Sequence, residues 1–215
     1  MAQNLKIDFV SDVSCPWCII GLKALETALA RLNGTVAAEM HFHPFELNPQ
    51  MGPDGQNIVE HIGEKYGSTP EQSAQARVMI KERAADLGFE MRMHEGSRIY
   101  NTFDAHRLLH WAEAEGKQAA LKHAMFKAYF TDGAKMSDHE TLVKVATSVG
   151  LDEKKARQIL ADGTYTDDVR AEQAFYRQQG INAVPAIVIN EKYLISGGQP
   201  VDVFERALRE IAQEN

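Results

Sequence analysis

Residues 5–25 read LKIDFVSDVSCPWCIIGLKAL, and this stretch decides the fold. Apolar and charged residues alternate over positions 5–9, which predicts a half-buried strand. Over positions 19–32 the apolar residues recur at spacings of three and four, which predicts a helix that Gly34 ends. Residues 36–42 alternate again. The pattern of strand, helix and strand predicts a βαβ unit.

Cys15 and Cys18 are the only cysteines of the 215-residue chain, and they lie at the predicted turn from strand to helix. Such a pair could be a structural clip, half of a metal site or a reactive dithiol. The apolar fraction of 44% is that of an ordinary globular protein, so a core can form without a disulfide. A structural clip is therefore not needed.

A metal site is not predicted. A structural zinc ion takes four ligands, and the chain has no second cysteine pair. The histidine pairs His41/His43 and His106/His110 would have to supply the other ligands. Neither pair has a cysteine or a carboxylate at ligand spacing, and such pairs are commonly solvated.

The dithiol interpretation agrees with the local chemistry of a Cys-x-x-Cys motif near a βαβ unit. Pro16 has a φ suited to a helix, and it lacks a backbone N–H, which at the first helical position would have no partner within the helix. Pro16 therefore predicts the start of the helix, with Cys15 at the N-cap and Cys18 one turn inside. The positive end of the helix favours a thiolate at Cys15. We therefore expect Cys15 to attack and Cys18 to resolve. Trp17 either covers the pair as a contact surface or packs internally.

The rest of the chain predicts one α/β domain that a helical insertion interrupts. Residues 44–66 are rich in loop signals, and helical patterns then dominate as far as Gln178. Capping signals stand at residues 69–72 and 137–140, and Thr166 is a further candidate cap.

Sheet periodicity returns over residues 186–195, before a last helix that opens at Pro200. We expect a thioredoxin-like domain from residues 1–50 and 164–215 that shares one sheet, with the insertion at residues 51–163.

Net charge and the N-terminal sequence limit the partners and the compartment. The formal net charge of −7 argues against nonspecific nucleic-acid binding, which needs clustered Lys and Arg. Lys6 and Asp8 interrupt the apolar residues near the N-terminus, so no signal peptide is predicted, and no stretch is apolar enough to span a membrane. We expect a cytoplasmic protein with neither nucleic acid nor membrane as partner.

Pro185 stands at the start of an apolar strand in the sequence AVPAIVIN. Proline is common at the first position of a strand, so this residue could simply begin one. Alternatively, a cis Val184–Pro185 bond could bring backbone groups beside the cysteines. The residues alone leave both interpretations open.

Several stretches together resemble the DsbA-like family of thioredoxin-fold proteins, and in particular its FrnE subgroup. They are CPWC after the first strand, NTFDAHRLLHWA (101–112), GINAVPAIVIN (180–190) and LISGGQP (194–200). The resemblance implies a thioredoxin-like α/β fold with a large all-helical insertion domain. It also implies a protein disulfide oxidoreductase with a CXXC redox-active centre.

The resemblance also implies roles for single residues. Cys15 would be the nucleophile and Cys18 the resolving thiol, and Pro185 would be a cis proline packed against their disulfide. Val184 would offer its backbone to an extended substrate segment, beside Pro16 and Trp17 of the motif.

The helix that NTFDAHRLLHWA predicts would contribute to the same cleft. Asn101, Asp104 and His106 would line or support the cleft between the insertion and the thioredoxin-like domain, or would serve only to cap and pack an interdomain helix.

Two related groups supply the main rival function. The 2-hydroxychromene-2-carboxylate isomerases and the kappa-class glutathione transferases share this architecture but resemble proteins with a serine or a lone thiol that works with glutathione. This chain departs from them in having both Cys15 and Cys18.

The alternatives are therefore a glutathione-dependent isomerase or transferase acting on an aromatic or polyketide-like molecule, and a client-binding folding module. In the favoured interpretation no cofactor is required, and glutathione could serve as reductant or co-substrate. The partner would be a disulfide-containing protein or a small thiol.

Overall fold

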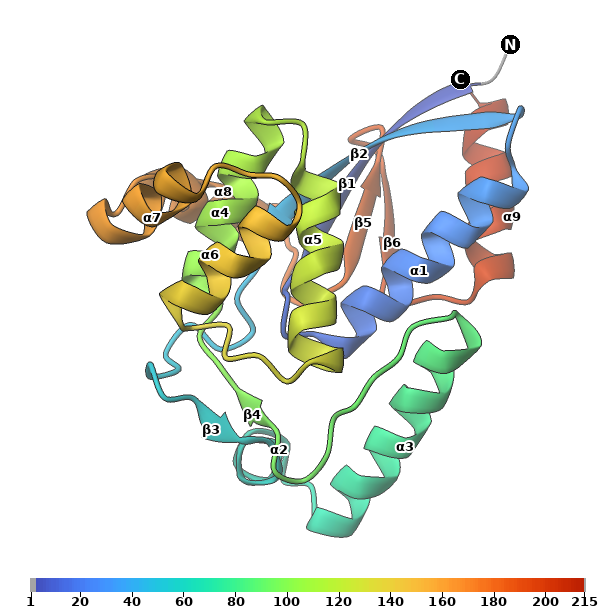
Figure 1. The fold of residues 1–215 in the computed structure, drawn as a ribbon. Helices are drawn as coiled ribbons and strands as arrows, with labels where there is room; N and C mark the ends of the chain where they lie inside the picture. Colours follow the sequence, from blue (N-terminus) through green and yellow to red (C-terminus); the bar gives the residue numbers. More distant parts are fainter. Residues whose placement is uncertain (1–2, 215) are drawn as a thin grey trace.

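The structure is a computed structural model that describes residues 3–214. Its main sheet has the strand order β2-β1-β5-β6 and joins segments from both ends of the chain (Figure 1). The strands are β1 (Gln3–Ser11), β2 (Val36–Pro44), β5 (Ala186–Ile189) and β6 (Tyr193–Ser196). β1 is parallel to β2 and antiparallel to β5, so the predicted βαβ unit and the shared sheet are confirmed.

Helix α1 (Pro16–Arg31) connects β1 to β2 and packs beside α9 (Val201–Gln213). Pro16 occupies the first helical position, and Cys15 is the N-cap residue with an extended backbone. Gly34, with a φ of 84°, lies in the turn that leads into β2. The buried side of α1 contributes to the main core, so the first turn of the helix is held in place by packing.

Two glycines allow α1 to approach the chain that follows β6. A Cβ added at Gly21 would lie 3.1 Å from the Cα of Gly198 and 3.2 Å from the Cγ of Pro185. A Cβ added at Gly198 would lie 2.8 Å from the backbone oxygen of Trp17. The first two turns of α1 therefore rest directly on Pro185 and on the backbone at Gly198.

Helices make up most of the chain between β2 and β5 (Figure 1). They are α2 (Ile58–Tyr66), α3 (Pro70–Asp86), α4 (Phe103–Ala114), α5 (Gln118–Phe126), the π-helical turn η1 (Lys127–Thr131), α6 (His139–Ser148), α7 (Glu153–Asp162) and α8 (Thr166–Gln178). Helices α4, α5 and α8 pack against β2. The division of the chain at residues 50 and 163 stays a prediction.

The segment between residues 44 and 66 differs from the predicted loop. Asn57 caps α2 by accepting hydrogen bonds from the N–H groups of Val59 and Glu60. The preceding residues form the short strand β3 (Gln56–Asn57), which pairs with β4 (Arg98–Ile99). The proline and glycine signals are concentrated before residue 56, and they concealed the helix that follows.

Two of the predicted caps also need correction. The capping box at Thr69 and Gln72 is present, but α6 begins one residue later than expected, with Asp138 accepting from the Thr141 N–H. Helix α8 is preceded by Tyr165, with a φ of 65° and no side-chain cap, so Thr166 is not the N-cap. In both places an adjacent residue takes the N-cap position, a difference that the pattern of apolar residues does not resolve.

No helix within residues 3–214 is both long enough and apolar enough to cross a membrane.

Candidate functional site

Cys15 lies at the turn between β1 and α1, and its thiol faces the residues that precede β5. The Cys15 Sγ donates a hydrogen bond to the Val184 carbonyl oxygen at 3.7 Å. The turn is closed by hydrogen bonds from the Cys15 N–H to Asp12 O at 3.2 Å and from the Cys18 N–H to Cys15 O at 3.1 Å. The antiparallel pairing of β1 with β5 brings these two distant segments together.

The peptide bond between Val184 and Pro185 is cis, in agreement with what the resemblance implied. Val184 lies on the cavity side of this bond and Pro185 on the side of α1, where it packs near Gly21. The carbonyl group that accepts from Cys15 is thus held between the sheet and the first turn of α1.

Cys18 lies one turn deeper than Cys15. Its exposed fraction is 0%, against 4% for Cys15, and both thiols are free. Burial raises the pKa of the Cys18 thiol well above its ordinary value, and a hydrogen bond with Cys15 adds to the shift. Cys18 is therefore held as a protonated thiol in contact with the more accessible sulfur.

Asp12 is a buried carboxylate below this pair. Its Oδ2 accepts from the Leu47 N–H at 2.8 Å, and its Oδ1 lies 3.3 Å from the Ser14 N and 3.5 Å from the His106 Nε2. Burial acts to raise the pKa of Asp12, but its interactions with His106 and with the Leu47 N–H outweigh burial and hold the pKa below its usual range. A negative charge therefore lies under the dithiol.

A cavity of about 790 Å³ opens in front of Cys15. Pro16 and Trp17 line it from α1, and Val184 lines it from the turn before β5. Its apolar lining is completed by Phe45, Leu47, Ile58, Ile62, Tyr66, Ala76, Ile80, Met93, Ile99 and Ala183. A cavity that is largely apolar, with a few polar groups and a thiol, is the usual form of a ligand site.

Cationic side chains stand around the same cavity. Lys65, Arg77 and Arg177 line it, whereas Glu46 is the only carboxylate among its lining residues. The Glu46 carboxylate already forms an ion pair with Arg170. The cavity is therefore locally positive in a chain whose net charge is −7.

Trp17 is half-buried, and the Arg83 guanidinium lies 5.9 Å from its ring centroid. It both lines the cavity and packs against the main core, so the two roles expected for this residue coexist.

The three residues predicted on α4 lie outside the lining of this cavity. Asn101 precedes α4, whose N-cap residue is Thr102, and its Oδ1 accepts from the Phe103 N–H; Asp104 pairs with Arg107 and His139. His106 lies beneath the dithiol, next to Asp12. None of the three lines the cavity; the position of His106 fits a supporting role, and those of Asn101 and Asp104 fit the alternative of local interactions around the start of α4.

Sequence reasoning missed one charged residue of the site, Asp12, and it also missed the burial of Lys122. Asp12 follows β1 directly within the quoted stretch, so its position before the cysteines was a usable signal. Lys122 lies on α5 and has an exposed fraction of 0%. Nothing in the local pattern distinguishes Lys122 from the surface lysines of other helices.

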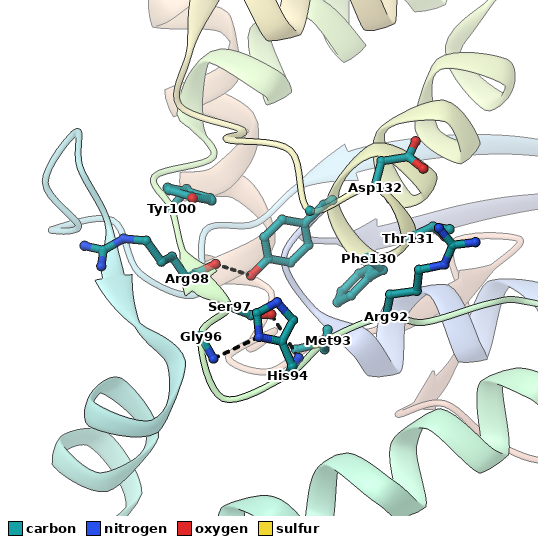
Figure 2. Close-up of a pocket in the computed structure, with 12 residues that line it drawn as sticks. Arg92, Met93, His94, Gly96, Ser97, Arg98, Tyr100, Phe130, Thr131 and Asp132 are labelled. Atoms are coloured by element: carbon teal, nitrogen blue, oxygen red, sulfur yellow. Dashed lines mark hydrogen bonds between the residues drawn. The ribbon is translucent and has the colours of Figure 1, made fainter.

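A second hollow, of about 320 Å³, lies between residues 92–100 and 129–133 (Figure 2). Its polar groups bond to one another: the Tyr129 hydroxyl donates to the Arg98 carbonyl, and the Gly96 N–H donates to the His94 ring. Neither cysteine lines it. Among residues 3–214, no group of three or more His, Cys, Asp or Glu side chains is placed to hold a metal ion.

Comparison with known proteins identifies a family that fits this geometry. The DSBA-like thioredoxin domain matches residues 6–209. The crystal structure of a probable DsbA oxidoreductase from Streptomyces coelicolor is 34% identical in sequence and superposes with a TM-score of 0.93, covering 98% of this chain and 91% of that one.

Two other proteins are also similar. The uncharacterized protein YwbO of Bacillus subtilis (strain 168) is 29% identical over 207 residues, which cover 96% of each chain. The cytosolic disulfide reductase DsbM from Pseudomonas aeruginosa, solved with GSH, is 15% identical with a TM-score of 0.65, covering 97% of this chain and 99% of that one. At that level of identity, DsbM shows a shared fold alone.

Proposed function

The chain belongs to the family of DsbA-like thioredoxin-domain proteins, and we propose that it is a thiol–disulfide oxidoreductase that uses Cys15 and Cys18 as its redox pair. One observation carries the proposal: the Cys15 sulfur lies at the N-terminus of α1 and at the wall of the large cavity, with a second thiol in contact behind it. The FrnE subgroup is part of the proposal and is supported by the four sequence stretches quoted above.

The first step is attack on a substrate disulfide. The Cys15 thiolate forms a bond to one substrate sulfur, the substrate S–S bond breaks, and the other sulfur leaves as a thiolate. The dipole of α1, whose N-terminus lies at Cys15, favours the attacking anion. An extended substrate segment would lie along the cavity wall beside Val184.

The second step releases the reduced substrate. Cys18 loses its proton and attacks the Cys15 sulfur, the mixed disulfide breaks, and the remaining substrate sulfur leaves as a thiolate that takes a proton from water. The substrate has then gained two electrons, and the enzyme holds a Cys15–Cys18 disulfide. An external thiol, such as glutathione or a protein dithiol, must reduce that disulfide before the next cycle.

The proposed direction of the reaction is reduction or isomerisation of disulfides in the cytoplasm. A reducing compartment keeps the pair mainly as the dithiol. DsbM, which shares the fold, is described as a cytosolic disulfide reductase, and this supports the same assignment. Disulfide-containing proteins or small disulfides would be the substrates.

Insulin reduction tests the proposal. We expect the wild-type protein to accelerate reduction of insulin by a small dithiol, and Cys15→Ser to lower the rate by about 10²-fold or more, because no nucleophile is left at the helix terminus. Ser148→Ala, at an exposed position of α6 outside the lining of the cavity, is the control and should keep the activity. Equal rates for the wild type and Cys15→Ser would refute the proposal.

A glutathione-dependent isomerase or transferase is the second candidate. The apolar cavity with Lys65, Arg77 and Arg177 favours it, because these groups suit a small acidic thiol. This candidate requires saturable glutathione binding and catalysis that survives Cys18→Ser. The oxidoreductase requires both sulfurs for turnover, so activity of Cys18→Ser on each substrate class separates the two candidates.

A client-binding folding module is the non-enzyme candidate. It requires that Cys15→Ser protect an unfolded client from aggregation as well as the wild type does, so a light-scattering assay of that variant tests it.

A further inference from the structure

Three cationic side chains in the cavity in front of Cys15 have no acidic partner within the protein. Lys65, Arg77 and Arg177 line the cavity, and none of them forms an ion pair with an Asp or Glu side chain among residues 3–214. The chain as a whole carries an excess of acidic residues, with a net charge of −7. Unpaired cations that gather in one cavity of such a chain favour an acidic ligand there.

The Lys65 ammonium is held in place with a donor to spare. Its Nζ donates to the Leu47 carbonyl oxygen at 2.8 Å and to the Asn48 Oδ1 at 2.7 Å. The ring of Tyr66 lies 5.5 Å from the Nζ, and no third oxygen within residues 3–214 accepts from it. An ammonium group has three N–H donors, so one stays available to a ligand. Because the side chain is already fixed, a ligand that binds it loses little rotamer entropy.

The two arginines reach the cavity from different helices. On α3, the Arg77 Nη1 donates to the Ser73 hydroxyl at 2.8 Å, and Ser73 has an exposed fraction of 4%. On α8, the Arg177 guanidinium lies 6.0 Å from the ring centroid of Phe45. Helices α3 and α8 lie on opposite sides of the N-terminal end of α1, which carries Cys15 (Figure 1). Positive charge is therefore offered to a ligand on both sides of the reactive sulfur.

The cavity continues past Lys65 into a second groove. This groove has a volume of about 640 Å³, and it shares the lining residues Leu47, Asn48, His61 and Lys65 with the cavity of about 790 Å³. Most of its other lining comes from residues 49–56. Together the two spaces exceed the upper end, about 1,000 Å³, of pockets that hold a small molecule. A ligand that begins at Cys15 therefore has room to continue over Lys65.

We propose, as an extension of the proposed oxidoreductase function, that the substrate is a polypeptide segment with acidic residues on both sides of its reactive cysteine. Its carboxylates accept from Lys65, Arg77 and Arg177, and its sulfur lies at Cys15. On one side the segment continues over Lys65 into the groove. The cations and the groove select the substrate, and the redox chemistry stays with the two cysteines.

Peptides with serine in place of the reactive cysteine test the binding without any chemistry. Isothermal titration calorimetry compares three of them: a long peptide with Glu on both sides of the serine, the same peptide with Gln for each Glu, and a short acidic peptide. The long peptides have about four residues on each side, which reach about 13 Å when extended. The short peptide has a single Glu on each side. We expect the long acidic peptide to bind about tenfold more tightly than either of the others.

Lys65→Gln should weaken the binding of the long acidic peptide by about threefold to fivefold and leave its Gln counterpart unchanged. Lys81→Gln, at a lysine of α3 outside the linings of both the cavity and the groove, is the matched control and should change neither. Lys65 also holds the chain at Leu47, so Arg177→Gln serves as a second variant with the same expected effect.

Three results would overturn the proposal. The first is equal binding of the long acidic peptide and its Gln counterpart. The second is a short acidic peptide that binds as tightly as the long one, because a small acidic disulfide would then be the ligand. The third is unchanged binding of the long acidic peptide in both Lys65→Gln and Arg177→Gln.

Failure of the proposed function would look different. The serine peptides would bind as expected, but the wild-type protein would not reduce the corresponding cysteine peptide in a mixed disulfide with a neutral thiol, or Cys15→Ser would reduce it equally fast.

Discussion

Asp12 lies between β1 and the two cysteines of the proposed redox pair. Its two oxygens satisfy backbone N–H groups of Ser14 and Leu47 and lie beside His106, all within the protein interior. Removing one partner of a buried charged group leaves the others unpaired, which costs more than the pair itself contributes. Asp12 therefore stabilises the fold as well as the dithiol.

Asp12→Ala should lower the free energy of unfolding by about 3–5 kcal/mol, because His106 and the Leu47 N–H lose their partner in the interior. Urea denaturation followed by circular dichroism measures the change. The matched control, Asp54→Ala, removes a carboxylate whose side chain is 90% exposed and should change stability by less than about 0.5 kcal/mol. A loss for Asp12→Ala as small as that of the control would contradict the assignment.

Cys18→Ser should trap the covalent intermediate. Cys15 can still attack, but no second thiol is present to break the mixed disulfide, so the protein should accumulate in covalent linkage to its substrate. Intact-protein mass spectrometry after incubation with a disulfide peptide measures the adduct. Absence of an adduct in Cys18→Ser, or its presence in Cys15→Ser, would show that the roles of the two sulfurs are wrongly assigned.

At the residue scale, the sequence was sufficient for the two cysteines and insufficient for the groups around them. Spacing alone places Cys15 at a helix terminus and Cys18 one turn inside, and the structure has them there. The Leu47 N–H, which donates to the Asp12 carboxylate, lies 35 positions further along the chain, so only tertiary packing shows that the two groups meet. The period of the apolar residues predicts which face of a helix is buried, but it does not predict which other segments pack against that face.

At the scale of elements, a polar cluster joins β2 to α8 and α4. His43 lies 2.9 Å from the Asp8 carboxylate and 3.6 Å from the Glu172 carboxylate, and Glu172 also lies 3.8 Å from His110. Burial acts to lower the pKa of His43, but its hydrogen bond with Asp8 and its ion pair with Glu172 outweigh burial and raise the pKa to about 9. The imidazolium therefore helps to hold α8 against the sheet, and Glu172 links α8 to His110 of α4.

The stability of the protein should consequently depend on pH through His43. Its pKa in the folded state lies above the ordinary value near 6.5, so its contribution is complete below pH 6.5 and is lost as the pH rises through 9. The difference in unfolding free energy between the wild type and His43→Gln should be about 1–3 kcal/mol at pH 6 and should shrink toward pH 9.5. Denaturation curves at several pH values measure it, and a constant difference would contradict the ion-pair interpretation.

The predicted secondary structure differs from the observed one mainly where contacts with distant segments determine whether an element forms or where it begins. The predicted strands and helices with long, regular apolar patterns are present in the structure, because the spacing of the apolar residues is enough to identify the buried face of each element. Helix α2 was missed because it has a single buried residue, Ile58, and follows a segment full of turn signals. The cap at Asp138 was misplaced because Ser137 and Asp138 are equally suited to the position, and only the geometry of the turn selects one.

At the scale of the whole molecule, charge is distributed unevenly. The chain carries a net charge of −7, yet the cavity in front of Cys15 is lined by three cationic side chains and by one carboxylate that is already paired. A local positive potential of this kind favours the binding of acidic ligands more than it contributes to the stability of the fold. The fold class could be predicted from the sequence, but this cavity could not, because its lining comes from segments between residues 14 and 184.

Arg77→Gln and Arg177→Gln should each raise the KM for oxidised glutathione by about threefold to tenfold, because each removes a partly exposed charge contact worth about 1 kcal/mol. Steady-state kinetics with a neutral disulfide as second substrate measures the selectivity, and that KM should change little. Arg92→Gln, in the hollow of Figure 2, is the control for loss of a positive charge elsewhere. Equal effects on both substrates would exclude a role of these arginines in charge selection.

The close approach of Gly21 and Gly198 gives a criterion for related sequences: it indicates whether a Cys-x-x-Cys pair is held in the same geometry. A methyl group at Gly198 would lie 2.8 Å from the Trp17 carbonyl oxygen, so the main chain of the turn that carries both sulfurs would have to move. A methyl group at Gly21 would require Gly198 or Pro185 to shift by a few tenths of an ångström. A homologue that keeps both cysteines but replaces Gly198 would have to displace the turn at Trp17, and one that replaces Gly21 would have to shift the chain at Gly198 or Pro185 by a smaller amount. In either homologue the motif would be intact and its geometry altered. An inspection of relatives for working dithiols should therefore include these two small residues along with the cysteines themselves.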